Sequence, residues 1–256
     1  MIDRSELPQY STSHVKLAVL LILSAFFTSF ARAQSCDEAN NRIYQITESE
    51  AQQTPDSLRT LLDLAIFVRG CEGNVSLELE LWLLNNEVFA LDKLERHEEA
   101  SARVGRFFDR YVADASDYYR ARFYLWRLHL RALDGDIIAL AKDYAEAQQY
   151  AHALDDLHRA YLHLNGAYAY FVMDQHASAR ALAEQARALI PAPETYEERK
   201  AAAHATLFSA EAGVWIGAGL PQVREQLDHA AALYGLLGDY RTGCNRHHAP
   251  GRDVRR

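Results

Sequence analysis

Glycine and proline are scarce in this chain, which has only 12 Gly and 6 Pro among 256 residues, most of them between apolar stretches. No stretch alternates apolar and polar residues in the way that a half-buried strand requires. Apolar residues instead recur with a helical period, in runs that short polar or glycine-containing breaks separate. The sequence therefore predicts an all-α protein, and its 49% of hydrophobic residues is enough for a large core.

Motifs for catalysis and metal binding are also missing. The sequence contains no HExxH, no pair of CxxC motifs and no GxSxG. The glycines between Gly213 and Gly219 end a helical run instead of following a strand, so they match neither a phosphate-binding loop nor a dinucleotide fingerprint. We therefore expect no enzyme activity, no cofactor and no metal in this chain.

The histidines are the residues on which a metal site would depend. His152, His158 and His163 lie near Asp155 and Asp156 in one predicted helix. His152 and Asp156 are four residues apart and could share a face, whereas the spacing of five between His158 and His163 splays them around the helix. This spacing favours solvated or groove-lining histidines over a metal site.

Acidic residues outnumber basic ones in this chain, except in one segment. The formal net charge is −8, yet the last sixteen residues, 241–256, carry five Arg and one Asp and show no apolar period. We expect this segment to be a disordered basic tail. The acidic remainder would repel phosphates, so we expect a protein or peptide partner and no nucleic acid.

The longest uncharged run lies near the N-terminus. It extends from Leu17 to Ala31, follows Lys16, and is followed by Ala33, where the small residues Ala31 and Ala33 suit cleavage by a signal peptidase. The run is short for a membrane span. Residues 1–33 are therefore predicted to be a signal peptide, with an uncleaved N-terminal membrane anchor and a buried helix as the alternatives. The expected location is the periplasm or outside the cell, with anchoring in the inner membrane as the alternative.

Cysteine is rare as well, with Cys36, Cys71 and Cys244 the only three. Export would place the chain in an oxidising compartment, where Cys36 and Cys71 could pair. They lie at the start of the first predicted helix and just after the second, and these two ends meet if the helices pack antiparallel. Two unpaired thiols are the alternative.

Helical runs fill the region 34–240, with short breaks of the kind that helical hairpins use. Thr54 and Pro55 form a typical helix start, and Gly70 and Pro191 are typical of helix ends. About ten helices are predicted, over residues 35–53, 55–70, 77–94, 98–112, 117–133, 137–150, 152–172, 177–190, 194–216 and 222–237.

Pairs of these helices form a repeated unit. One small or apolar position recurs as Ala100, Leu140, Ala179 and Val223, at spacings of 40, 39 and 44 residues. A single unit cannot bury its apolar face alone and must stack on its neighbours. The region 34–240 is therefore predicted to be one α-solenoid of stacked antiparallel helix pairs.

The clearest copy, Leu164 to Pro191, resembles a tetratricopeptide repeat. Its residues Ala167, Tyr170, Ala179, Ala186 and Pro191 occupy places where that family has small residues, Tyr and Pro, while His163 departs from the pattern. The other copies depart at more places, namely Val88, Phe107, Arg131, Leu140 and Glu211. HEAT-like helix pairs, which have a longer period, are the structural alternative.

The resemblance implies a scaffold that binds a protein or peptide on a concave face lined by the first helix of each pair. Tyr and Arg are good anchors on such a face. The residues that we assign to it are Arg120, Arg127, Arg131, Asn165 and Tyr168, and an ordinary solvated face is the alternative.

A second interpretation comes from the C-terminal end, where the repeat pattern calls for a further helix. We expect Leu227, Leu233, Tyr234 and Leu237 to form an uncovered apolar face, as at an incomplete solenoid. By family analogy, the chain could be the sensory part of a truncated, membrane-anchored bacterial signalling protein whose output domain is missing, such as a diguanylate cyclase, histidine kinase or regulator. The sequence does not indicate an oligomeric state.

Overall fold

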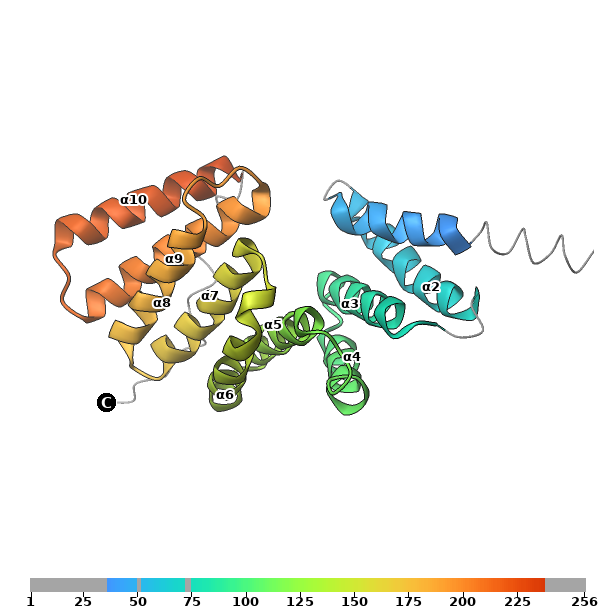
Figure 1. The fold of residues 1–256 in the computed structure, drawn as a ribbon. Coiled ribbons are helices and arrows are strands. Elements are labelled where there is room, and N and C mark those ends of the chain that lie inside the picture. The colour runs from blue at the N-terminus through green and yellow to red at the C-terminus, as the bar shows by residue number, and fades with distance from the viewer. Residues whose placement is uncertain (1–35, 50–51, 72–74, 238–256) are drawn as a thin grey trace, which may run out of the picture. The chain divides into compact units, whose positions relative to one another are not determined.

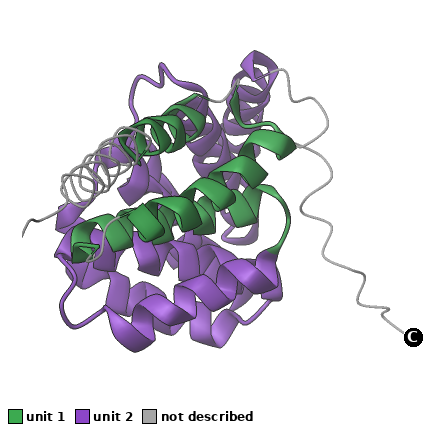
Figure 2. Ribbon diagram, turned by 90° about the vertical axis from the view of Figure 1, so that its right-hand side faces the viewer, with its two compact units in different colours: residues 1–96 green, residues 97–256 purple. Residues whose placement is uncertain are grey.

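The computed structural model describes residues 36–49, 52–71 and 75–237, and these residues form helices, turns and no strand (Figure 1). The chain divides into two compact units, residues 1–96 and 97–256 (Figure 2). The sequence predicts one repeat domain over residues 34–240, and the boundary between the two compact units falls within it, between Arg96 and His97.

The first unit consists of a helix over residues 36–48, α2 (Pro55–Cys71) and α3 (Leu77–Lys93). The Thr54 hydroxyl accepts a hydrogen bond from the Ser57 N–H, and the Ser76 hydroxyl accepts one from the Leu79 N–H, so both helices begin at side-chain caps. The core is aliphatic, and its most deeply buried members are Ile43, Ile46, Leu58, Leu61, Val68, Leu83 and Ala90.

Two polar connections join the elements of the first unit. A disulfide links Cys36 to Cys71 and thereby ties the helix of residues 36–48 to the end of α2. Arg69 of α2 lies 2.6 Å from a carboxylate oxygen of Glu80 and 2.5 Å from one of Glu87, both on α3. Because Glu87 is buried, Arg69 satisfies a carboxylate that would otherwise be costly to bury.

The second unit contains seven α-helices within residues 97–237. They are α4 (His97–Arg110), α5 (Asp117–Asp134), α6 (Ile137–Ala147), α7 (Asp156–Val172), α8 (His176–Leu189), α9 (Tyr196–Trp215) and α10 (Leu220–Leu236). Successive helices pack on each other, and α7 also contacts α5 and α9 (Figure 1). The pairs α5–α6, α7–α8 and α9–α10 are therefore stacked helical hairpins, as the repeat pattern predicts.

Small residues allow this stacking. Ala167, Ala179 and Ala186 of the clearest repeat copy are buried, and α8 packs closely on both α7 and α9. On α9 the small residues Ala201, Ala203 and Ala205 are buried in turn. A small side chain lets two helix backbones approach each other, so the alanine-rich registers mark the contacts between helices.

Capping residues set the helix boundaries in the second unit. Asp136 caps α6, Asp155 caps α7, and Thr195 with Glu198 forms a complete capping box at the start of α9. Gly135 ends α5 in the left-handed conformation, with φ of 75°.

The structure departs from the sequence prediction between α6 and α7. The sequence predicts α-helices over residues 137–150 and 152–172. Instead, α6 ends at Ala147, a 3₁₀ helix (η2, Gln148–Ala153) follows, and α7 begins after its cap at Asp155. The side chain of Asp155 accepts a hydrogen bond from the backbone N–H of His158 and so caps α7. The helix therefore starts after Asp155, later than the apolar spacing alone suggests.

The expectation about the C-terminal apolar face is partly wrong. Leu233 and Tyr234 are each only 8% exposed, because they pack against Ala202 and Ala203 of α9. Leu227 and Leu236 are exposed. The predicted signal or anchor (1–33) and basic tail (241–256) lie outside the described residues. Among the residues that the structure does describe, no helix combines the length and the apolar character needed to cross a bilayer.

Candidate binding surface

The three arginines that the sequence assigns to the binding face are engaged within the fold. Arg127 Nη2 and Arg131 Nε lie 2.6 and 2.9 Å from the carboxylate oxygens of Asp143, a residue of α6 that is 3% exposed. Arg120 donates hydrogen bonds to the carbonyl oxygens of Val112 and Ala113. These contacts stabilise the α5–α6 hairpin and the turn before α5, which does not support a role for these arginines as anchors for a ligand.

Arg127 also has aromatic neighbours. Its guanidinium carbon lies 3.6 Å from the ring centroid of Phe108 on α4 and 4.7 Å from that of Tyr124 on α5. Such cation–π stacking adds to the ion pair with Asp143. Arg127 therefore joins α4, α5 and α6.

The other two predicted residues lie on the α7 face that meets α9. Tyr168 contacts Phe208 of α9 edge-on, with ring centroids 6.4 Å apart. Asn165 donates a hydrogen bond to the carbonyl oxygen of Tyr161, one turn earlier in the same helix. Both side chains are half-buried, and no described contact joins either of them to the three arginines.

A different set of residues meets at the N-terminal parts of α5, α7 and α9. We call Arg122, Asp155, His158, Tyr161 and Glu197 the Arg122 cluster. Within it, His158 Nδ1 lies 2.6 Å from a carboxylate oxygen of Asp155, and the Tyr161 hydroxyl donates to Glu197 at 2.7 Å. Because the first helices of three successive hairpins contribute to it, the Arg122 cluster lies on the helix layer that the repeat resemblance assigns to ligand binding.

Arg122 is the unusual member of this cluster. Its side chain is half-buried, and no described residue accepts a hydrogen bond from it or forms an ion pair with it. Burial lowers the pKa of Arg122, while the charge of Asp155 partly offsets that effect from beyond ion-pair distance. A guanidinium has five N–H donors, so Arg122 retains donors for a ligand.

The neighbouring groups have shifted pKa values that suit hydrogen bonding. Burial and the charge of Arg122 lower the pKa of His158. Burial alone would raise the pKa of Asp155, but the hydrogen bonds from His158 hold that pKa below its usual value. Burial and the nearby Glu197 raise the pKa of Tyr161, so its hydroxyl stays protonated and donates. Near pH 7 the cluster therefore combines a cationic donor with a largely neutral imidazole.

The histidines face different surroundings. His158 pairs with Asp155, His163 lies 3.3 Å from the Tyr144 hydroxyl on α6, and His152 Nε2 lies 3.4 Å from Asp117. Among the described residues, no group of three or more His, Cys, Asp or Glu side chains is arranged to hold a metal ion.

Arg122 is not among the residues that the sequence assigns to the binding face, because that assignment follows a single stripe of α5. Residues 120, 127 and 131 lie on one helical stripe, and Arg122 lies on another. The buried residues of α5 include Ala121, Phe123, Tyr124 and Leu128, so the helix is covered on more than one side. The apolar pattern therefore cannot distinguish the stripe that faces α6 from the one that faces α7.

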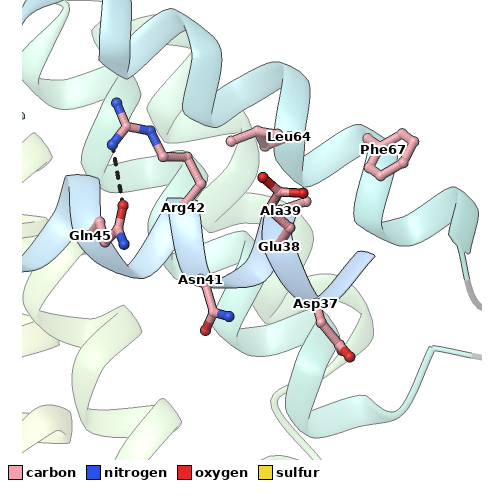
Figure 3. A pocket seen from close by; sticks show the side chains of 8 residues that line it. All are labelled: Asp37, Glu38, Ala39, Asn41, Arg42, Gln45, Leu64 and Phe67. Carbon is pink, nitrogen blue, oxygen red and sulfur yellow. Dashed lines mark hydrogen bonds between the residues drawn. The ribbon is translucent and has the colours of Figure 1, made fainter. Parts of the chain in front are cut away.

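The first unit has an open groove of about 970 Å³ between the helix of residues 36–48 and α2 (Figure 3). Arg42 in its wall is hydrogen-bonded to Gln45 and Gln52. Most of the lining side chains are exposed, which indicates a shallow groove. It is lined by Asp37, Glu38, Ala39, Asn41, Arg42, Gln45, Leu64 and Phe67. Since it has no buried polar group that lacks a partner, it is a weaker candidate than the Arg122 cluster.

These features define an α-helical repeat protein. No family model matches the sequence, and no curated protein matches it. Among solved structures, the chain is similar to PlcR from Bacillus thuringiensis in complex with the peptide PapR7 and DNA, with a TM-score of 0.59, 8% identity, and coverage of 80% of this chain and 71% of that one. It is also similar to BtubC from P. vanneervenii, with a TM-score of 0.58, 12% identity, and coverage of 89% and 95%. At these identities the likeness concerns the fold alone.

Proposed function

We propose that this chain is a divergent tetratricopeptide-like scaffold that binds a peptide or an extended segment of a protein, with Arg122 as its polar anchor. The observation that carries the proposal is the half-buried guanidinium of Arg122, for which no described residue is a hydrogen-bond partner. Peptides present carbonyl oxygens along the backbone and a carboxylate at the end, and Arg binds both kinds of oxygen well.

The surroundings of Arg122 support a peptide ligand. Tyr118 is exposed on α5 one turn before Arg122, and the charge of Arg122 also acts on His158 of α7. Aromatic side chains beside a cationic donor are typical of interface anchors. The fold adds support, because PlcR, which has a similar fold, was solved with a bound peptide.

The other parts of the proposal depend on the sequence. The run Leu17–Ala31 favours export to the periplasm or outside the cell, and the missing motifs favour a scaffold without enzyme activity or cofactor. The PlcR complex also contains DNA, so nucleic acid has to be tested directly. The net charge of −8 favours peptide over DNA.

The test begins with a selection of random twelve-residue peptides displayed on phage against the full chain. The dissociation constants of the selected synthetic peptides are then compared between the wild type and two variants, Arg122→Gln and Lys142→Gln. Each variant removes one positive charge, and Lys142 is exposed on α6. Since the guanidinium would donate directly to the peptide, we expect Arg122→Gln to weaken binding at least tenfold and Lys142→Gln to change it less than twofold.

Two outcomes contradict the proposal. One is equal binding by the two variants while circular dichroism shows both to be folded. The other is a chain that selects no peptide but binds a fluorescent random-sequence DNA duplex at physiological salt.

A further inference from the structure

The end of α9, the turn after it and the start of α10 present large apolar side chains to solvent. Val214 is 57% exposed, Trp215 68%, Ile216 45% and Leu220 81%. The turn lies at one end of the α9–α10 hairpin (Figure 1). Single exposed apolar residues are normal on a protein surface, but four within residues 214–220 form a patch that requires an explanation.

The neighbouring turn between α7 and α8 extends this patch. His176, at the start of α8, stacks on Trp215 with ring centroids 5.1 Å apart and an interplanar angle of 19°. Phe171, at the end of α7, contacts His176 at 5.0 Å, and the next residue, Val172, is 46% exposed. The two turns therefore lie side by side. We call Val172, Val214, Trp215, Ile216 and Leu220 the apolar tip.

Charged residues are absent from the longer turn. Between Glu211 and Arg224 no residue carries a charge. Nearby, Arg180 is paired with Glu184 at 3.0 Å, and Asp174 is the exposed acidic residue of the α7–α8 turn. The apolar tip therefore has no excess of basic side chains that would attract an anionic surface.

We propose that the apolar tip inserts into the surface of an electrically neutral lipid bilayer. A turn at the end of a helical hairpin can enter a soft interface without a matching groove, which a protein partner would have to supply. Trp is favoured at membrane interfaces because its large apolar ring carries a polar N–H, and aliphatic neighbours add buried area. If the uncharged run of residues 17–31 acts as the predicted export signal or anchor, it would also bring the chain to a membrane.

This proposal is independent of peptide binding by the Arg122 cluster. The cluster is at the N-terminal parts of α5, α7 and α9, whereas the apolar tip is at the C-terminal ends of α7 and α9. Insertion of the tip would hold the second unit at the bilayer surface and leave the Arg122 cluster accessible.

The test uses the full chain with phosphatidylcholine vesicles whose acyl chains carry bromine, which quenches tryptophan fluorescence only at short range. The chain has three tryptophans, so Trp215→Phe provides the reference from which the signal of Trp215 is obtained by difference. We expect the difference signal to fall at least twofold on brominated vesicles relative to unbrominated ones. This readout concerns Trp215 itself, so binding through residues 17–31 does not imitate it.

A matched pair of variants strengthens the test. Leu220→Ser removes an exposed apolar side chain within the tip, and Ile138→Ser removes one that is 83% exposed on α6. We expect Leu220→Ser to reduce the quenching of Trp215 by at least half and Ile138→Ser to leave it unchanged. Vesicle-bound protein whose Trp215 is not quenched overturns the proposal. The proposal is also overturned if Trp215 becomes shielded from solvent in the absence of lipid and this shielding rises with protein concentration. That result would indicate a contact between two copies of the chain.

Discussion

Gly166 lies in the interior of α7 at a point where the ring of Tyr144 on α6 comes very close. A Cβ atom added at Gly166 would lie 2.6 Å from the Tyr144 ring carbons Cε2 and Cζ. Tyr144 is buried, so its ring has little room to move away. A glycine weakens a helix slightly, but the missing Cβ at this position allows α6 and α7 to pack closely.

The first prediction is that Gly166→Ala destabilises the protein although alanine is the better helix former. We expect a loss of about 1–3 kcal/mol in the free energy of unfolding, because the methyl group overpacks the contact with Tyr144. The control is Gly105→Ala in α4, where a Cβ would meet no atom within 4 Å. That change should stabilise the protein by roughly 0.5–1 kcal/mol. Urea unfolding followed by circular dichroism measures both, and a gain in stability for Gly166→Ala would contradict the packing described here.

For single residues, the sequence predicts which positions hold small, buried side chains better than it predicts which residues contact each other. The buried alanines Ala167, Ala179 and Ala186 follow from the repeat pattern, because only small residues fit between helices that approach closely. The pairing of Arg127 and Arg131 with Asp143 does not follow from it. That pairing depends on the rotation of α5 relative to α6, which the apolar pattern determines only to within about a third of a turn.

At the scale of elements, the helix of residues 36–48 is the first member of the first unit, and its attachment to α2 has two parts. Ile43 and Ile46 are fully buried in the common core, and the disulfide joins Cys36 to Cys71. A short helix on its own is only marginally stable in water. Most of the stability of this helix must therefore come from the core contacts and from the disulfide.

The second prediction is that removal of the disulfide destabilises the first unit. Cys36 and Cys71 are 35 residues apart, and closing a loop of that length in the unfolded chain corresponds to roughly 4 kcal/mol in the chain-entropy treatment. The double variant Cys36→Ser with Cys71→Ser should lose up to about that amount in urea unfolding. The control Cys244→Ser removes a cysteine outside the bond and should change stability little. Wild-type protein that unfolds at the same urea concentration with and without dithiothreitol would contradict the prediction.

Element boundaries could be predicted where a cap or a breaker marks them in the sequence. Thr54 with Pro55, Gly135 with Asp136, and Thr195 with Glu198 are local signals, and helices begin or end at each of them. The 3₁₀ helix η2 has no such signal. Its residues Tyr150 and Ala151 are partly buried against the core formed by α5, α6 and α7, so tertiary packing determines its path.

At the scale of the whole molecule, buried ionisable groups connect the stability of the chain to pH. Burial, together with the charge of Arg122, lowers the pKa of His158. Burial and the charge of Arg159 lower the pKa of His163 in the same direction. Both histidines belong to α7, which contacts α5, α6, α8 and α9, so their protonation bears on the centre of the second unit.

The third prediction is that the second unit loses stability as the pH falls from 7.5 to 5.5. The folded-state pKa values of His158 and His163 are below the ordinary value of about 6.5, so in this range the unfolded chain binds more protons than the folded chain. Linkage then makes the free energy of unfolding fall with decreasing pH, starting near pH 6.5 and continuing until the folded-state histidines are protonated. The measurement is the urea midpoint at pH 7.5 and 5.5 for the wild type and for the double variant His158→Gln with His163→Gln.

The comparison depends on the difference between the two pH values and not on absolute stability, since glutamine also changes the contacts with Asp155 and Tyr144. The double variant should show a smaller drop than the wild type, whereas His229→Gln, an exposed site on α10, should show the wild-type drop. If the two units unfold in separate transitions, the transition that responds to the double variant belongs to the second unit. An equal drop in all three proteins would mean that the pH dependence comes from other groups, and that His158 and His163 of α7 do not oppose protonation in the folded chain.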